Sequence, residues 1–228
     1  GRAVTNDCTD SGGPEPPAGA YIYYPMDGNA NDSSGGNRHA TTSGVSFAAA
    51  KYAQGMQTNP GENDYAELPY LSGVNPSTQS LTIAFGVYIP PEDLGVFRYV
   101  GGVPLGTDQR MYVMRNASNN WRMGIQANSA SSATEFSVQS GWTHVCQTMN
   151  AATDTATLWI NGQQGAVSGA SVQTYTSYTF SGNYRIGLPN GRSTAQAGNH
   201  LYDEFRLYQS VVSCADLYAA WEPPTSTW

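Results

Sequence analysis

Residues 81–89 read LTIAFGVYI, and their large apolar side chains fall at every second position, at Leu81, Ile83, Phe85, Val87 and Ile89. Alternation with a period of two gives one face of a β-strand to a core and leaves small or polar groups on the other face. The segment therefore predicts a long central strand. Other β-rich runs lie on both sides of it, separated by clusters of Gly, Asn, Asp and Pro, which is the pattern of a β-sandwich rather than of alternating strands and helices.

The same pattern predicts the other elements. We expect strands over residues 20–24, 45–47, 55–58, 65–68, 81–89, 98–103, 110–115, 121–126, 134–138, 143–150, 156–160, 184–186 and 201–208. Asn161 and Gly162 follow an apolar run, and both tolerate the positive φ of a type I′ turn, so a hairpin is expected there. Ser213 as N-cap and Asp216 at the third helical position predict one or two helical turns near the C-terminus.

The 228 residues fit one large all-β domain. Residues 1–19 are rich in Gly, Pro and Ser and predict an arm or linker. We expect the domain to span residues 20–222 and a short tail to span residues 223–228. No repeat with a period of 20 to 50 residues is present, which disfavours a propeller or a solenoid.

The charge balance narrows the classes of partner. The formal net charge is −7, and the ten basic residues are nine Arg and the single Lys51. A nucleic-acid partner is not expected, because neutralising phosphates requires a clustered basic surface. No apolar run of about 18 residues occurs, so no membrane span is predicted. The opening of the chain, without Met or a leader pattern, fits a processed secreted protein, and we expect an extracellular location.

The three cysteines permit at most one intrachain bridge. Cys146 lies in a strand-like run, where a small buried thiol is the simplest interpretation. Cys8 and Cys214 lie in the two terminal segments, which often meet in a single domain. We therefore predict a disulfide between Cys8 and Cys214 that fixes the N-terminal arm.

Four stretches, in this order, resemble the laminin G-like group of the concanavalin A-like lectin and glucanase superfamily. They are YYPMDGNANDSSG at 23–35, KYAQG at 51–55 with DYAELP at 64–69, GWTHV at 141–145 with LWING at 158–162, and DEFRLY at 203–208. The resemblance implies an all-β, two-sheet antiparallel jelly-roll sandwich with one short C-terminal helical turn. Its order and spacing are specific for the fold and much less specific for function.

A calcium site is the strongest candidate constellation. Ca²⁺ takes oxygen ligands from carboxylates, amides and backbone carbonyls, and the loop after the first expected strand is rich in Asp and Asn. The resemblance implies a structural ion between Asp27 and Asp203, and we predict the ligands Asp27, Asn29, Asp32 and Asp203. The alternative is that Asp27 and Asn29 only form a turn through hydrogen bonds to their own backbone.

An enzyme is not expected. Glycosidases on this fold resemble one another in carrying two acids on alternate positions of one strand, and that spacing is absent here. Asp203 and Glu204 are adjacent and should point to opposite faces of a strand. His144 is expected to be part of the sandwich rather than catalytic. No serine-hydrolase elbow, phosphate-binding loop or zinc-ligand spacing is present.

A sugar site needs exposed aromatic faces beside amide and carboxylate groups. We predict ligand contacts from Trp121, Tyr112, Asn116, Asn190 and Arg192, although packing within the sandwich is the commoner role for any one aromatic residue.

The function predicted from the sequence is an extracellular, calcium-stabilised module that binds carbohydrate or glycoprotein. The alternative is a structural subunit of a surface assembly, such as a fibre, surface layer or virion decoration. Lys usually protects sheet edges, and a chain with one Lys could form a homo-oligomer or filament. A polysaccharide-cleaving enzyme is the weaker third alternative.

Overall fold

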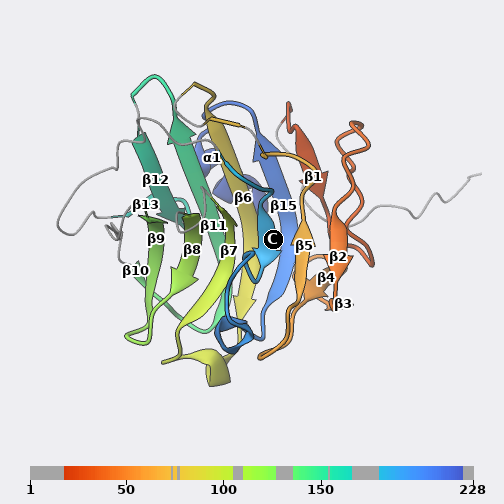
Figure 1. The fold of residues 1–228 in the computed structure, drawn as a ribbon, viewed down its shortest axis with the longest axis vertical. Helices are drawn as coiled ribbons and strands as arrows, with labels where there is room; N and C mark the ends of the chain where they lie inside the picture. Colours follow the sequence, from red (N-terminus) through yellow and green to blue (C-terminus); the bar gives the residue numbers. More distant parts are fainter. Residues whose placement is uncertain are drawn as a thin grey trace, which may run out of the picture.

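A computed structural model describes residues 18–72, 74–75, 78–104, 110–126, 136–153, 155–165 and 180–222. Most of the predicted arm, the predicted tail and Cys8 lie outside these residues. The described chain forms two antiparallel sheets, one of eight strands and one of seven, that lie face to face (Figure 1). The predicted all-β, two-sheet antiparallel jelly-roll sandwich is therefore confirmed.

The eight-stranded sheet has the order β13-β12-β11-β6-β15-β4-β3, and β1 also pairs with β15. Its strands are β1 (Ile22–Tyr24), β3 (Ser46–Ala49), β4 (Gln54–Gln57), β6 (Leu81–Ile89), β11 (Gly141–Asn150), β12 (Thr155–Ile160), β13 (Gln163–Gln164) and β15 (Leu201–Tyr208). The seven-stranded sheet has the order β10-β9-β8-β7-β14-β5-β2. Its strands are β2 (Thr41–Ser43), β5 (Tyr65–Glu67), β7 (Arg98–Pro104), β8 (Arg110–Arg115), β9 (Asn120–Gln126), β10 (Phe136–Ser137) and β14 (Arg185–Gly187).

The core lies between the sheets. The five alternating apolar residues of β6 are fully buried and face the opposite sheet, as predicted. Phe85 stacks on Phe205 of β15 with ring centroids 6.0 Å apart, and Phe205 stacks on Tyr24 of β1 at 5.6 Å. Burying each large apolar side chain contributes about 1.5–3 kcal/mol, so β6, β15 and β1 form a firmly packed centre.

The structure contains both the turn and the helix that local sequence signals predict. Asn161 and Gly162 both have positive φ in the turn that joins β12 to β13, and Gly165 N–H donates to the Leu158 carbonyl at 3.0 Å. Two short 3₁₀ helices, η1 (Pro91–Asp93) and η2 (Thr194–Gln196), lie in connections. The single described α-helix is α1 (Cys214–Trp221), and the Ser213 hydroxyl accepts a hydrogen bond from Asp216 N–H at 3.2 Å as its N-cap.

Helix α1 packs on the outer face of the eight-stranded sheet, behind β6 in Figure 1. Gly86 of β6 makes this possible, because a Cβ there would lie 2.8 Å from the indole nitrogen of Trp221. His144 of β11 lies under the same indole, with ring centroids 5.4 Å apart. In the described part of the chain no helix has the length and hydropathy to cross a membrane.

A disulfide joins Cys146 of β11 to Cys214 at the start of α1. The predicted Cys8–Cys214 bridge and the predicted free thiol at Cys146 are therefore both wrong. The reason is strand alternation: Val145 faces the core, so Cys146 points to the outer face, where it meets the helix. The bridge spans a sequence separation of 68 residues and fastens α1 to the sheet.

Candidate functional site

The site forms where β15 departs from regular pairing with β6. The register shifts between Asp203 and Arg206, and Glu204 has a φ of +56°, which is the geometry of a β-bulge. Asp203 pairs with Gly86 and Arg206 pairs with Ala84, both of which face α1. The bulge adds one residue, so Asp203 and Glu204 lie on the same outer face. The expectation that they point to opposite faces is wrong for this reason.

Asp203 is completely buried and only partly hydrogen-bonded. Its Oδ2 accepts a hydrogen bond from Tyr52 N–H at 3.0 Å, while its buried Oδ1 has no hydrogen-bond partner. Burial raises the pKa of Asp203 to about 8 despite that hydrogen bond, and the like charges of Glu204 and Asp27 also raise it. A buried carboxylate oxygen without a hydrogen-bond partner destabilises the fold, so this atom is a candidate ligand for a cation.

Unlike Asp203, the neighbouring Glu204 has a well hydrogen-bonded carboxylate. It accepts hydrogen bonds from the Tyr23 hydroxyl at 2.9 Å and from Arg206 Nη2 at 2.7 Å. Burial raises the pKa of Glu204 to about 7, against the attraction of Arg206. The sequence interpretation did not include Glu204 in any site, because the bulge that turns it toward Asp203 leaves no mark in the strand pattern.

Asp27 approaches from the loop after β1. Its Oδ1 accepts a hydrogen bond from Gln54 N–H at 3.0 Å, two residues from the amide that binds Asp203. Its charge contributes to the raised pKa values of both Asp203 and Glu204. The structure thus brings the predicted pair Asp27 and Asp203 together, and we call Asp27, Asp203 and Glu204 the acidic cluster.

The chemistry of the acidic cluster fits a calcium ion. Among the described residues, only Glu204 of these three carboxylates forms an ion pair, with Arg206, so the fully ionised cluster carries excess negative charge. A hard divalent cation takes 6–8 oxygen ligands, and Asp203 Oδ1 is unused. In the described residues no group of three or more His, Cys, Asp or Glu side chains is arranged around one metal position. Backbone carbonyls or water would have to complete the coordination.

The other two predicted metal ligands form local hydrogen bonds. Asp32 accepts hydrogen bonds from the backbone N–H groups of Tyr23, Ser34 and Arg38 at 2.9–3.1 Å. Burial opposes ionisation, but these hydrogen bonds lower the pKa of Asp32. The exposed Asn29 accepts a hydrogen bond from Asn31 N–H at 2.9 Å, which is the turn that the sequence left open as an alternative.

Two predicted sugar contacts are buried. Trp121 has no exposed surface and lies in the core, because β9 turns it inward opposite Arg115. Tyr112 is 5% exposed and packs edge-on against Tyr99, with centroids 5.5 Å apart. Neither offers an open face to a sugar, so their assignment as aromatic platforms is wrong.

The remaining predicted contacts lie in loops. Asn116 accepts hydrogen bonds from Ser118 N–H and Asn120 N–H and thereby shapes the β8–β9 turn. Asn190 is exposed. In the same loop, the Arg192 guanidinium lies 4.9 Å from the Tyr99 ring centroid. The structure therefore brings Arg192 to the Tyr99–Tyr112 pair and leaves Asn116 in a separate turn.

A second buried polar group was not predicted at all. Asp93 lies within 3.3 Å of both Arg115 and His200, which are fully buried. Burial opposes ionisation, but the hydrogen bond from His200 and the charges of Arg115 and Arg98 lower the pKa of Asp93 to about 2. Burial lowers the pKa of His200 to about 4. The group ties the η1 connection to β8 and β15.

A laminin G family model, described as the concanavalin A-like lectin/glucanases superfamily, matches residues 60–217. No curated protein sequence matches the chain.

Among solved structures, domain 4 of the extracellular arabinanase AbnA from Geobacillus stearothermophilus, in complex with arabinotriose, is similar with a TM-score of 0.69 and 16% identity. The match covers 89% of this chain and 98% of that one. The binding domain of Paraclostridial Mosquitocidal Protein 1 is similar with a TM-score of 0.67 and 15% identity, over 89% of this chain and 52% of that one. Trypanosoma rangeli sialidase in complex with sialic acid has a TM-score of 0.67 and 16% identity, over 92% of this chain and 34% of that one. At these identities the likenesses show the fold.

Proposed function

The chain belongs to the concanavalin A-like lectin/glucanases superfamily, and from this membership we propose that it is an extracellular, calcium-stabilised carbohydrate-binding module. The observation that carries the proposal is the match to an isolated domain in complex with arabinotriose, which extends over 98% of that domain. Nearly the whole of this chain thus corresponds to a unit whose solved structure contains a saccharide.

A binding role is favoured over a catalytic one by the position of the acids. Glycosidases of this kind direct two carboxyl groups, about 5–5.5 or 6.5–9.5 Å apart, at a bound sugar. Asp203 and Glu204 are at most 1% exposed and lie on the face that α1 covers. A polysaccharide cannot reach them there. His144 is 1% exposed, and burial lowers its pKa to about 3, so it is a neutral packing residue.

Calcium is proposed at the acidic cluster, with Asp203 Oδ1 and Asp27 as the carboxylate donors, and with backbone carbonyls or water completing the coordination. The ion would supply the missing partner of Asp203 Oδ1 and balance the excess charge. The chain's own residues do the positioning: Asp27 holds the backbone of Gln54, and Asp203 holds the backbone of Tyr52. Three segments distant in sequence would then be fixed at one place, which stabilises the loops around β1 and β15.

Retention on immobilised glycans and a glycan array, each run with calcium and with EDTA, test the proposal. We expect binding in calcium and weaker binding in EDTA. Calcium should also raise Tm for the wild type and not for Asp203→Asn. Glu62→Gln is the matched control, because Glu62 is an exposed acid outside the cluster. Retention of no glycan in calcium would refute the binding proposal, and an unchanged wild-type Tm would refute the calcium site.

The alternative of a filament-forming subunit receives less support. The edge strands β2, β3, β10 and β13 have two to four residues each. Short edges are one way in which natural sheets avoid edge-to-edge pairing. We therefore propose a monomer, and light scattering that detects oligomers at micromolar concentration would contradict it.

A further inference from the structure

An open cleft of about 410 Å³ lies where the start of β1 meets the loop after Asp32 and the residues after β15. Its volume falls in the range of roughly 300–1,000 Å³ that is typical of small-molecule sites. Its lining is polar and includes Tyr21, Ser34, Gly36, Arg38, Gln209 and Ser210. None of these residues belongs to the acidic cluster or to the contacts predicted from sequence.

Arg38 is held rigidly at this cleft. Its guanidinium carbon lies 3.7 Å from the Tyr21 ring centroid, and Nη1 donates to the Tyr21 carbonyl at 3.2 Å. Its backbone N–H donates to Asp32 at 2.9 Å. These contacts fix the base and one face of the side chain, so little entropy remains to be lost when a ligand binds.

The Arg38 guanidinium also forms no ion pair within the described residues, and the nearby Asp32 carboxylate accepts the Arg38 backbone N–H instead. Arg98, Arg115, Arg185 and Arg206 each form an ion pair with a carboxylate, whereas in the described part of the chain no carboxylate pairs with Arg38. Within the described residues its Nε and Nη2 have no acceptor, and neither atom is buried, so both face solvent. In a chain of net charge −7, a fixed cation with free donors is an available anion site.

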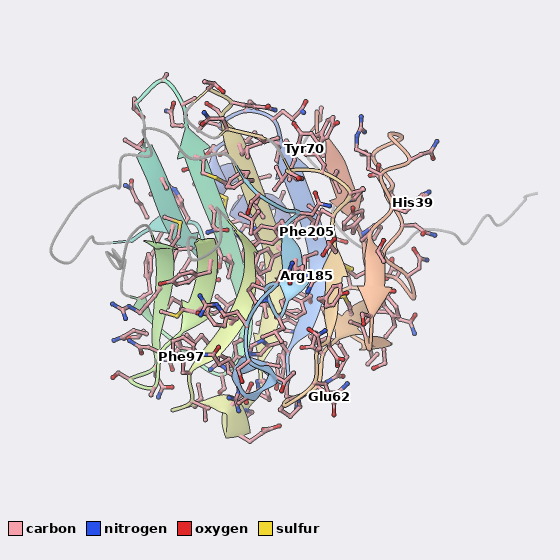
Figure 2. The ribbon with its side chains drawn as sticks, viewed as in Figure 1. His39, Glu62, Tyr70, Phe97, Arg185 and Phe205 are labelled. Carbon is pink, nitrogen blue, oxygen red and sulfur yellow. A yellow bond between two sulfur atoms is a disulfide. The ribbon has the colours of Figure 1, made fainter. Side chains whose placement is uncertain are left out.

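The neighbouring groups suit a polyhydroxylated ligand. The Tyr70 hydroxyl accepts hydrogen bonds from Gln209 Nε2 at 2.7 Å and from Gln79 Nε2 at 2.8 Å. With both lone pairs used, its own proton is left to donate. Tyr70 packs on Tyr21 with centroids 4.7 Å apart and lies at the upper end of β15 and β1 in Figure 2. Gln209 and Ser210 are exposed and can meet sugar hydroxyls.

We propose that this cleft binds an acidic saccharide and that Arg38 pairs with the carboxylate of the sugar. The proposal rests on the carbohydrate-binding function above and names its ligand class. The planar guanidinium fork matches a carboxylate and can form two parallel hydrogen bonds to it. A polyphosphate ligand would need several cations, and the cleft has only Arg38 among its lining residues. An apolar ligand would not suit the polar lining.

Two substitutions test Arg38 in different ways. Arg38→Gln removes the charge. Gly36→Ala keeps the charge but moves it, because a Cβ at residue 36 would lie 1.5 Å from Arg38 Nη1. The backbone of Gly36 is not in the left-handed region, and the clashing atom is the end of a flexible side chain, so the variant should fold. Arg185→Gln, in the seven-stranded sheet near the centre of Figure 2, removes the same charge elsewhere and is the control.

Calorimetry provides the readout, with sialyllactose against lactose, oligogalacturonate against its methyl ester, and a sulfated oligosaccharide beside them. We expect at least one carboxylated sugar to bind about tenfold or more tightly than its neutral partner, and both test variants to lose about tenfold in affinity for it, while Arg185→Gln binds as the wild type does. Equal affinity for charged and neutral sugars, or unchanged binding by Arg38→Gln, would overturn the cleft assignment and leave carbohydrate binding intact. Preference for a sulfated sugar over the carboxylated ones would overturn the carboxylate assignment. A wild type that binds no glycan would overturn this inference together with the proposed function.

Discussion

In the metal-free protein, Asp203→Asn should increase stability at neutral pH. Burial raises the pKa of Asp203 to about 8, against an ordinary value of 3.8. Between these values the folded protein holds a proton that the unfolded chain has released, so the free energy of unfolding falls as pH rises through this window. An asparagine side chain does not titrate, so the variant is free of that cost.

The size of the effect follows from the same two pKa values. At pH 7 the unfolded carboxyl is about 3.2 pH units above its pKa, and at about 1.4 kcal/mol per pH unit the folded state carries a cost of roughly 4 kcal/mol. The amide oxygen can still accept the hydrogen bond from Tyr52 N–H. We expect the variant to be more stable by about 2–4 kcal/mol at pH 7, which is about 5–15 °C in Tm. At pH 4 the difference should be within about 1 kcal/mol.

Urea denaturation in EDTA at pH 4, 5.5, 7 and 8 measures this difference, with Glu62→Gln as the control for loss of an exposed charge. Calcium should then reverse the order, because a ligand at 100 times its Kd stabilises the protein that binds it by about 2.7 kcal/mol. If Asp203→Asn is less stable than the wild type in EDTA at pH 7, the buried-charge reasoning is wrong. If the variant gains as much from calcium as the wild type, Asp203 is not a ligand.

Three further outcomes are expected. Cys214→Ser should lower the free energy of unfolding by about 4 kcal/mol, because it opens a cross-link over 68 residues, while Cys8→Ser should leave urea denaturation unchanged; a loss of similar size in Cys8→Ser would reinstate the Cys8–Cys214 bridge. Asp93→Asn should cost about 3–5 kcal/mol in the same assay, because it leaves a buried guanidinium without its counter-ion, and a cost below about 1 kcal/mol would contradict this. Trp121→Ala should lower stability by about 3–5 kcal/mol, as expected for a core cavity, and loss of sugar binding with unchanged Tm would instead make Trp121 a binding platform.

The sequence was sufficient where a local pattern fixes a local structure. Alternation in residues 81–89 identified the central strand and its buried face, and Asn161-Gly162 identified the β12–β13 turn. The Ser213 cap located the start of α1. Each of these signals depends on backbone conformation or on the burial of one face of a strand. A few neighbouring residues determine either property.

The errors concern the face on which a residue lies and its distant partners. Cys146 looked like a buried thiol because its strand is buried on both faces, and only the docked helix shows that its partner is Cys214. Trp121 looked available because a strand of mixed residues does not reveal which face is inward. Glu204 was missed because one bulge reverses the parity of β15. Arg38 attracted no attention because an absent counter-ion is a property of the folded surface, and no sequence pattern records it.

The acidic cluster and the buried group of Asp93, Arg115 and His200 make the free energy of unfolding depend on pH in opposite directions. The pKa of His200 is lowered to about 4 and that of Asp93 to about 2, so both make the folded state less stable as the solution is acidified, His200 from about pH 6.5 downward and Asp93 below about pH 4. The pKa values of Asp203 and Glu204 are raised to about 8 and about 7, so these acids cost stability as pH rises above about 4. An acid that must stay neutral gives the fold no benefit at neutral pH, whereas an acid that coordinates a cation does. The proposed ion binding would give both carboxyl groups beside Asp27 a role that the empty fold does not give them, and a bound calcium ion would offset the loss of stability at alkaline pH while leaving the loss at acid pH to the Asp93 group.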